Sequence, residues 1–262
     1  MIPAIILFLL YTSSAWAMLR SVKQPRLEPL AWILILIAII GHSDVIMHMM
    51  RVNARFSIGL LEAMSLLGWT LAVLACLISI DKQNRVLGAI LMLSAAVGAA
   101  MSFAGGRYAE ATVGWELTAH ILLSMGAAAL LFAAAVTAIL LVILDRRLRM
   151  RRIADLSSAL PPLDALEKVM FRLVAAGFGL LTLALITGFV FVTNLFTQNL
   201  VQKTVLSLIA WVIFGVLLIG RMRFGWRGRS AVRWTLSGFG ILAVAYFGVK
   251  FVLEYLFGRH WG

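Results

Sequence analysis

Eight apolar stretches follow one another along this chain, and each is long enough to cross a lipid bilayer as a helix. A spanning helix needs about 17–25 predominantly apolar residues. The stretches cover residues 2–19, 29–49, 57–80, 85–104, 115–144, 170–193, 202–220 and 232–256. Because 63% of the 262 residues are hydrophobic and only 13% are charged, a soluble domain is excluded. The sequence predicts an all-α polytopic membrane protein, a bundle of about eight transmembrane helices.

The connections between the stretches contain no internal repeat, low-complexity tract or separate soluble domain. We therefore predict a single integral membrane domain over residues 1–262. The longest polar segment, residues 145–169, is expected to be a cytoplasmic loop in which Pro161-Pro162 precedes a short interfacial helix. No basic residue precedes the first stretch and three follow it, which is the reverse of a secretory signal, so that stretch is expected to remain as a helix.

The charge of the connections predicts which way the helices point. Sixteen Lys and Arg residues fall in one set of connections, within residues 20–26, 82–85, 146–168 and 221–233, and five fall in the other set. Since basic residues concentrate in cytoplasmic loops, the first set is predicted to be cytoplasmic and both termini external. The net charge of +12 therefore indicates contact with the head groups of anionic membrane lipids rather than with nucleic acid.

In this orientation several ionisable residues lie in or beside the outer half of the membrane. They are His42, Asp44, His48, Glu62, Glu116, His120, Lys250, Glu254 and His260. An ionisable group in hydrocarbon costs about 2.5–3.5 kcal/mol, so each normally faces a partner or a cavity. Lys250 and Glu254 are spaced as an ion pair on one helix face. The remaining residues are candidates for ligand chemistry near the outer surface.

Two interpretations of these residues stay open. His42 and His120 are imidazoles at membrane depth in separate helices, and metal or haem ligation would explain both. Asp44 and His48 share a helix face and, with Glu62, are candidate metal ligands. Alternatively, Asp44 orients His48 or pairs with a nearby arginine, and Glu62 makes a polar contact with a neighbouring helix. No nucleophile–base order, P-loop or dinucleotide fingerprint is present, so the sequence does not predict an enzyme.

Two segments resemble the CcsA-type cytochrome c assembly family. The first is Trp115-Glu116-Leu117-Thr118-Ala119-His120, at the start of a long helix that ends in a basic stretch. The second runs from Lys203-Thr204-Val205-Leu206-Ser207 through Gly225-Trp226-Arg227-Gly228-Arg229 to Tyr246-Phe247-Gly248. The resemblance is strong from about Trp115 to Gly258. It is closest to the short, eight-span YpjD- and HemX-like branch of bacterial inner-membrane proteins.

The resemblance implies a multi-pass inner-membrane protein that handles haem, held without a covalent bond, for cytochrome c biogenesis. By position, His120 is similar to the family's external histidine, and His42 to its transmembrane histidine. His260 lies near the place of a second external histidine, and Trp115 opens the motif as a further candidate haem contact. Proteins of cytochrome c biogenesis or haem biosynthesis are the implied partners.

One segment departs from the family pattern. Haem-presenting members carry a tryptophan-rich segment before the seventh span, whereas residues 192–202 of this chain contain no tryptophan. Haem binding, sensing or regulation is therefore a better expectation than the attachment of haem to a cytochrome. The alternative function is a divalent-cation transport component or transporter accessory protein that uses the histidines and carboxylates of the outer half.

Overall fold

A computed structural model gives the fold of residues 2–52, 60–101, 115–149, 162–191 and 200–248. The secondary structure of these residues is entirely helical. The α-helices are α1 (Ile2–Ser21), α2 (Glu28–Val52), α3 (Leu60–Ser79), α4 (Arg85–Met101), α5 (Trp115–Arg149), α6 (Leu163–Phe191), α7 (Leu200–Phe224) and α8 (Gly228–Ala243). Short 3-10 helices at Pro25–Leu27 and Lys82–Asn84 precede α2 and α4, and a π-helical turn, Val244–Gly248, continues α8.

The prediction of an all-α polytopic membrane protein is confirmed. Within the described ranges, seven helices are long and apolar enough to cross a membrane, namely α1 to α7. The described part of α8 is shorter, and the rest of its predicted span lies beyond residue 248, outside the described residues. The predicted outward orientation of both termini stays a prediction.

Two helices extend well into the segment that the sequence predicts as a cytoplasmic loop. Helix α5 continues to Arg149, where Arg149 pairs with Asp145 one turn earlier at 3.0 Å. Helix α6 begins directly after Pro162, and its first turn holds an ion pair between Asp164 and Lys168 at 2.7 Å. Pairs four residues apart stabilise a helix outside the membrane core. The residues after Pro162 are therefore the first turns of α6 and not a separate interfacial helix.

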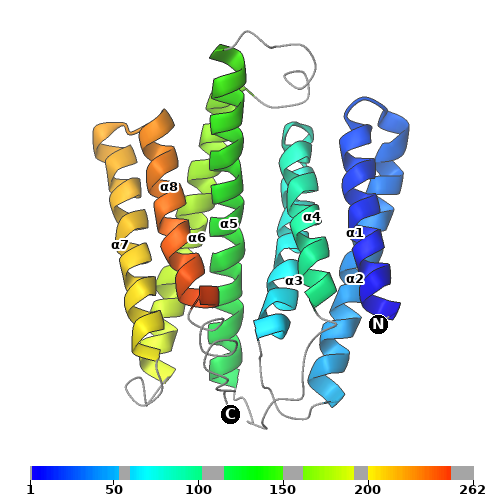
Figure 1. Cartoon of the computed structure of the whole chain (residues 1–262), viewed down its shortest axis with the longest axis horizontal. Helices are drawn as coiled ribbons and strands as arrows, with labels where there is room; N and C mark the ends of the chain where they lie inside the picture. Colours follow the sequence, from blue (N-terminus) through cyan, green and yellow to red (C-terminus); the bar gives the residue numbers. More distant parts are fainter. Residues whose placement is uncertain (1, 53–59, 102–114, 150–161, 192–199, 249–262) are drawn as a thin grey trace. The chain divides into compact units, whose positions relative to one another are not determined.

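The helices form two compact units, α1 to α4 and α5 to α8. In each unit, consecutive helices run in opposite directions (Figure 1). In the first unit, α4 packs extensively against both α3 and α1. Helices α3 and α4 approach most closely at Gly68 and Gly98, where a Cβ added to Gly98 would lie 2.6 Å from the Gly68 Cα. Such backbone contact through small residues is a common way for membrane helices to associate.

At one end of the first unit, a buried arginine ties three helices together. Arg85, the first residue of α4, is 3% exposed. Its guanidinium forms an ion pair with Glu28 at the start of α2 and donates a hydrogen bond to the Ser21 hydroxyl, at the end of α1, at 3.3 Å. The Lys82 ammonium also lies 3.7 Å from the Glu28 carboxylate. The buried cation is therefore neutralised by one carboxylate of its own unit.

In the second unit, α5 packs most extensively against α6, and α7 against α8. Gly238 in α8 allows the fully buried Phe214 ring of α7 to approach, since a Cβ there would lie 2.9 Å from that ring. The turn between α7 and α8 contains Gly225 and Gly228, whose φ angles of 64° and 56° favour glycine. These contacts position the ends of α5, α6 and α7 around the candidate site.

Candidate functional site

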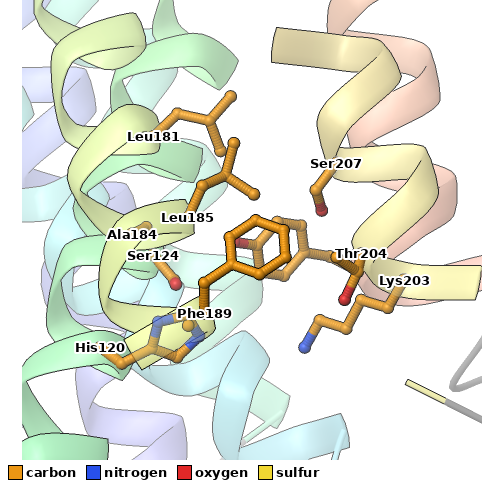
Figure 2. A pocket seen from close by; sticks show the side chains of 11 residues that line it. His120, Ser124, Leu181, Ala184, Leu185, Phe189, Lys203, Thr204 and Ser207 are labelled. Carbon is orange, nitrogen blue, oxygen red and sulfur yellow. The ribbon is translucent and has the colours of Figure 1, made fainter. Parts of the chain in front are cut away.

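A pocket with a cavity volume of about 100 Å³ opens in the second unit among α5, α6, α7 and the π-helical turn. It is lined by His120, Ser124, Leu181, Ala184, Leu185, Gly188, Phe189, Lys203, Thr204, Ser207 and Tyr246. In Figure 2, His120 and Phe189 lie on one side of this pocket and Lys203 and Thr204 on the other. We call it the His120 pocket.

The hydrogen bonds around His120 determine which ring nitrogen is available to a ligand. The Nδ1 atom lies 3.1 Å from the Thr187 hydroxyl oxygen on α6. That hydroxyl has its own acceptors, the carbonyl oxygens of Leu183 at 2.9 Å and Ala184 at 3.0 Å. When the Thr187 hydroxyl donates its proton to one of these carbonyl oxygens, it must accept a hydrogen bond from His120 Nδ1–H. The neutral imidazole then carries its lone pair on Nε2. Orientation of one nitrogen by such a bond is typical of metal-ligating histidines.

The walls of the His120 pocket combine apolar surface with one cation. Gly188 leaves room for the imidazole, because a Cβ there would lie 3.1 Å from the His120 Cε1. Phe189 and Tyr246 contribute aromatic surface. The Lys203 ammonium lies 4.9 Å from the centre of the Tyr246 ring, and Figure 2 shows the Lys203 side chain extending toward the pocket. The pocket thus offers an imidazole nitrogen, a largely apolar lining and a positive charge.

His42 occupies a different setting, in the core of the first unit. It is fully buried in α2, and both ring nitrogens have partners. Nδ1 is hydrogen bonded to the Tyr11 hydroxyl of α1 at 3.1 Å, and Nε2 to the Ser65 hydroxyl of α3 at 3.0 Å. Each hydroxyl can donate or accept, so the neutral ring is satisfied in either tautomer. In this arrangement His42 links three helices, and ligation of an ion would require one of these bonds to open.

Replacing Tyr11 with phenylalanine is expected to lower the free energy of unfolding by about 1–3 kcal/mol, because it leaves a buried imidazole nitrogen without its partner. Tyr11 is itself 0% exposed, so water does not replace the lost hydroxyl from the surface. Unfolding of the purified protein by a denaturing detergent, followed by circular dichroism, measures the change. Thr12→Val on the same helix is the control, since the Thr12 hydroxyl bonds only carbonyl oxygens of its own helix. Equal effects of the two changes would contradict the structural role of the Tyr11–His42 bond.

The other predicted site residues that the structure describes lie outside the His120 pocket. Trp115 is 72% exposed at the start of α5, with its ring 5.9 Å from that of Phe191. Asp44 and His48 are exposed on α2, and Glu62 is half-buried in the first turn of α3. His260 falls outside the described residues. Among the residues that the structure describes, no group of three or more His, Cys, Asp or Glu side chains could hold a metal ion.

His42 belongs to the first unit and His120 to the second. The hypothesis that both act on one bound group therefore stays a prediction. The metal-ligand roles of Asp44, His48 and Glu62 likewise stay predictions.

Comparison with known proteins identifies the family of this chain. The model of the family described as "Cytochrome C assembly protein" matches residues 57–257, well over half of the chain. The chain belongs to the cytochrome c assembly protein family. The match includes α3 to α8 as described, and with them every residue that lines the His120 pocket.

Individual relatives agree with that assignment. The chain is 40% identical over 145 residues to "Inner membrane protein YpjD" of Escherichia coli K12, covering 55% of this chain and 54% of that protein. It is 32% identical over 100 residues to "Cytochrome c biogenesis protein CcsA" of Synechococcus elongatus, covering 37% of this chain and 31% of that protein. The match thus spans about half the length of the first of these relatives and less of the second. No solved structure matches the chain.

Together, the seven candidate spans, the family and the relative named as an inner membrane protein confirm the predicted localisation. The chain is a multi-pass protein of the inner membrane.

Sequence reasoning missed several residues of the two histidine environments. Thr187 and Gly188, which orient and accommodate His120, lie in an apolar helix and match no motif. Tyr11 and Ser65 were likewise not singled out. The available signal was general: a polar side chain in a membrane helix usually bonds to a neighbouring helix. That rule marks such residues as candidates but does not name their partners.

Proposed function

We propose that this protein handles haem for cytochrome c biogenesis and that the His120 pocket is its haem site. The observation that carries the proposal is the orientation of His120, whose Nδ1 lies 3.1 Å from the Thr187 hydroxyl oxygen. With Nδ1–H as the donor in this bond, Nε2 is the ligand nitrogen. Histidine is a common axial ligand of haem iron in proteins. Membership of the cytochrome c assembly family, reported above, supports the same class of function.

The residues of the pocket fit a haem in two respects. Leu181, Leu185 and Phe189 offer apolar surface to a macrocycle and exclude water from it. The Lys203 ammonium offers a cation to an acidic substituent at the edge of the ring. A bound haem would supply iron coordination and redox chemistry, while the chain's own residues orient it.

The absence of tryptophan from residues 192–202 favours binding or sensing of haem over its attachment to a cytochrome. Stacking of the haem would then depend on the aromatic rings of Phe189 and Tyr246, which line the pocket. Proteins of cytochrome c biogenesis or haem biosynthesis are the partners that this role requires. His42 and His260 are further candidate ligands.

Titration of the purified full-length protein with haemin, followed by absorption spectroscopy in the oxidised and reduced states, tests this function. We expect a Soret band that shifts and sharpens on binding, and His120→Ala is expected to abolish that change. Thr187→Val removes the group that orients the imidazole and is expected to weaken binding about 10–100-fold, as is usual when the hydrogen-bond partner of a ligating histidine is lost. Both variants are compared by circular dichroism to establish that the helices are retained.

His48→Ala is the matched control, because His48 is an exposed histidine on α2 that lines no part of the pocket. It should bind haemin as the unchanged protein does. A protein that gives no Soret change with haemin, or a His120→Ala variant that binds as tightly as the unchanged protein, would refute the proposed site.

A further inference from the structure

A second pocket, separate from the His120 pocket, lies where α5 ends and α6 and α8 begin, within the second unit. These three helix ends lie on one side of that unit (Figure 1), the side that the loop charges predict to be cytoplasmic. The pocket has a cavity volume of about 720 Å³. Its charged lining residues are Asp145, Arg146, Arg149, Asp164, Glu167, Arg227, Arg229 and Arg233. We call it the basic pocket.

The carboxylates of the basic pocket are already bound to cations and N–H donors. Glu167 accepts hydrogen bonds from the Arg221 guanidinium at 2.9 Å and from the Gly228 backbone N–H at 3.1 Å. Asp164 pairs with Lys168 at 2.7 Å. Neither Arg221 nor Lys168 lines the pocket, so these two carboxylates are neutralised from outside it.

The third carboxylate, Asp145, pairs with Arg149 at 3.0 Å and with Arg229 at 3.7 Å. The other three arginines of the lining have no such carboxylate partner in the described part of the chain. Within the described residues, no carboxylate lies at ion-pair distance from Arg146, Arg227 or Arg233. The pocket thus holds an excess of guanidinium groups that its own acids do not neutralise.

The turn that carries Arg227 is held in a defined shape. The Trp226 backbone N–H donates to the Gly220 carbonyl at 3.1 Å, and the Arg221 guanidinium donates to the Trp226 carbonyl at 3.1 Å. The Trp226 ring also stacks on the Trp234 ring, with centres 5.5 Å apart. Fixing the turn lowers the entropy cost of gathering the arginines around one ligand.

We propose that the basic pocket binds a phosphate group. Guanidinium groups present planar pairs of donors that match phosphate oxygens, and hydrogen bonds between ionised partners of this kind are stronger than those between neutral groups. Basic pockets between membrane helices on the cytoplasmic side bind phospholipid head groups. Leu141, Leu163 and Val232 lie in the same lining and offer apolar surface beside the cations. The phosphate comes from an anionic lipid head group or from a soluble phosphorylated molecule, and both sources share this chemistry.

The test uses the detergent-purified full-length protein and its Arg227→Gln/Arg233→Gln variant. Native mass spectrometry measures retention of phosphatidylglycerol relative to phosphatidylcholine, and inorganic phosphate is added in a second arm as a competitor. The unchanged protein should retain phosphatidylglycerol about tenfold better than the variant, since losing charge-assisted hydrogen bonds at two positions costs at least that factor. Loss of the lipid on adding millimolar phosphate identifies a site that also accepts the soluble ion, and retention identifies a lipid site.

Arg147→Gln/Arg223→Gln is the matched control, because it removes the same charge from exposed positions outside the lining. It should retain phosphatidylglycerol as the unchanged protein does. Arg227→Lys/Arg233→Lys keeps the charge but loses the planar donors, so its retention of phosphatidylglycerol should be intermediate.

Equal losses in the control and pocket variants would attribute binding to diffuse charge and overturn the proposal. An unchanged protein that neither prefers phosphatidylglycerol nor binds phosphate would overturn it as well. Since haemin binding is measured separately, this result is independent of the proposed function.

Discussion

Replacing Glu28 with alanine is expected to lower the free energy of unfolding by about 3 kcal/mol, because it leaves the buried charge of Arg85 without its carboxylate. The Arg85 side chain is 4% exposed, whereas that of Glu28 is 27% exposed. Removing one partner of a buried pair costs about 3–5 kcal/mol, and the partial exposure of Glu28 favours the lower end of that range. Arg85 also spans α1, α2 and α4, so the loss should loosen the end of the first unit.

Removing the arginine instead of the carboxylate is expected to lower the free energy of unfolding by less. In Arg85→Met, the Glu28 carboxylate still has the Lys82 ammonium 3.7 Å away. It is also partly exposed to water, so its charge is not buried without a partner. Unfolding by a denaturing detergent, followed by circular dichroism, compares the two variants. The Glu28→Ala/Arg85→Met double variant should be more stable than Glu28→Ala alone, since it removes the unpaired buried charge. A larger loss for Arg85→Met than for Glu28→Ala would contradict this account.

The sequence predicts the number and type of helices because the membrane imposes one strong requirement. A segment that crosses hydrocarbon must be apolar over about 20 residues and must satisfy its backbone hydrogen bonds internally. Hydropathy detects the apolar core of such a helix but not its ends. Helices α5 and α6 therefore extend beyond their predicted bounds, where ion pairs such as Asp145–Arg149 stabilise turns outside the membrane.

The candidate site is less accessible to sequence reasoning. His120 stands out because an ionisable residue in an apolar helix is rare, and the family resemblance identifies the same residue. Its surroundings depend on how α6 and α7 pack against α5, which helix periodicity does not encode. Thr187 faces the imidazole, and Gly188 makes space for it, only because of that packing. For His42, the depth in the membrane was predictable, but its two hydroxyl partners required the structure.

A close backbone contact between α3 and α4 gives the second large expected effect. Gly98→Ala in α4 is expected to lower the free energy of unfolding by about 1–3 kcal/mol, the usual cost of overpacking, and Gly98→Leu by more. A Cβ at Gly98 would lie 2.6 Å from the Gly68 Cα and 2.7 Å from the Met64 carbonyl oxygen, both on α3. Both obstacles are backbone atoms, so a side-chain rotation does not relieve the clash and the two helices must separate.

Gly179→Ala in α6 supplies the control for this change. A Cβ at Gly179 would meet nothing within 4 Å, so the substitution adds no clash. Alanine also favours the helix over glycine by about 1 kcal/mol, so Gly179→Ala should leave the protein as stable as before or slightly more stable. Detergent unfolding compares both variants with the unchanged protein. If Gly98→Ala is as stable as Gly179→Ala, α3 and α4 do not meet at Gly68 and Gly98, and their association must depend on other contacts along the pair.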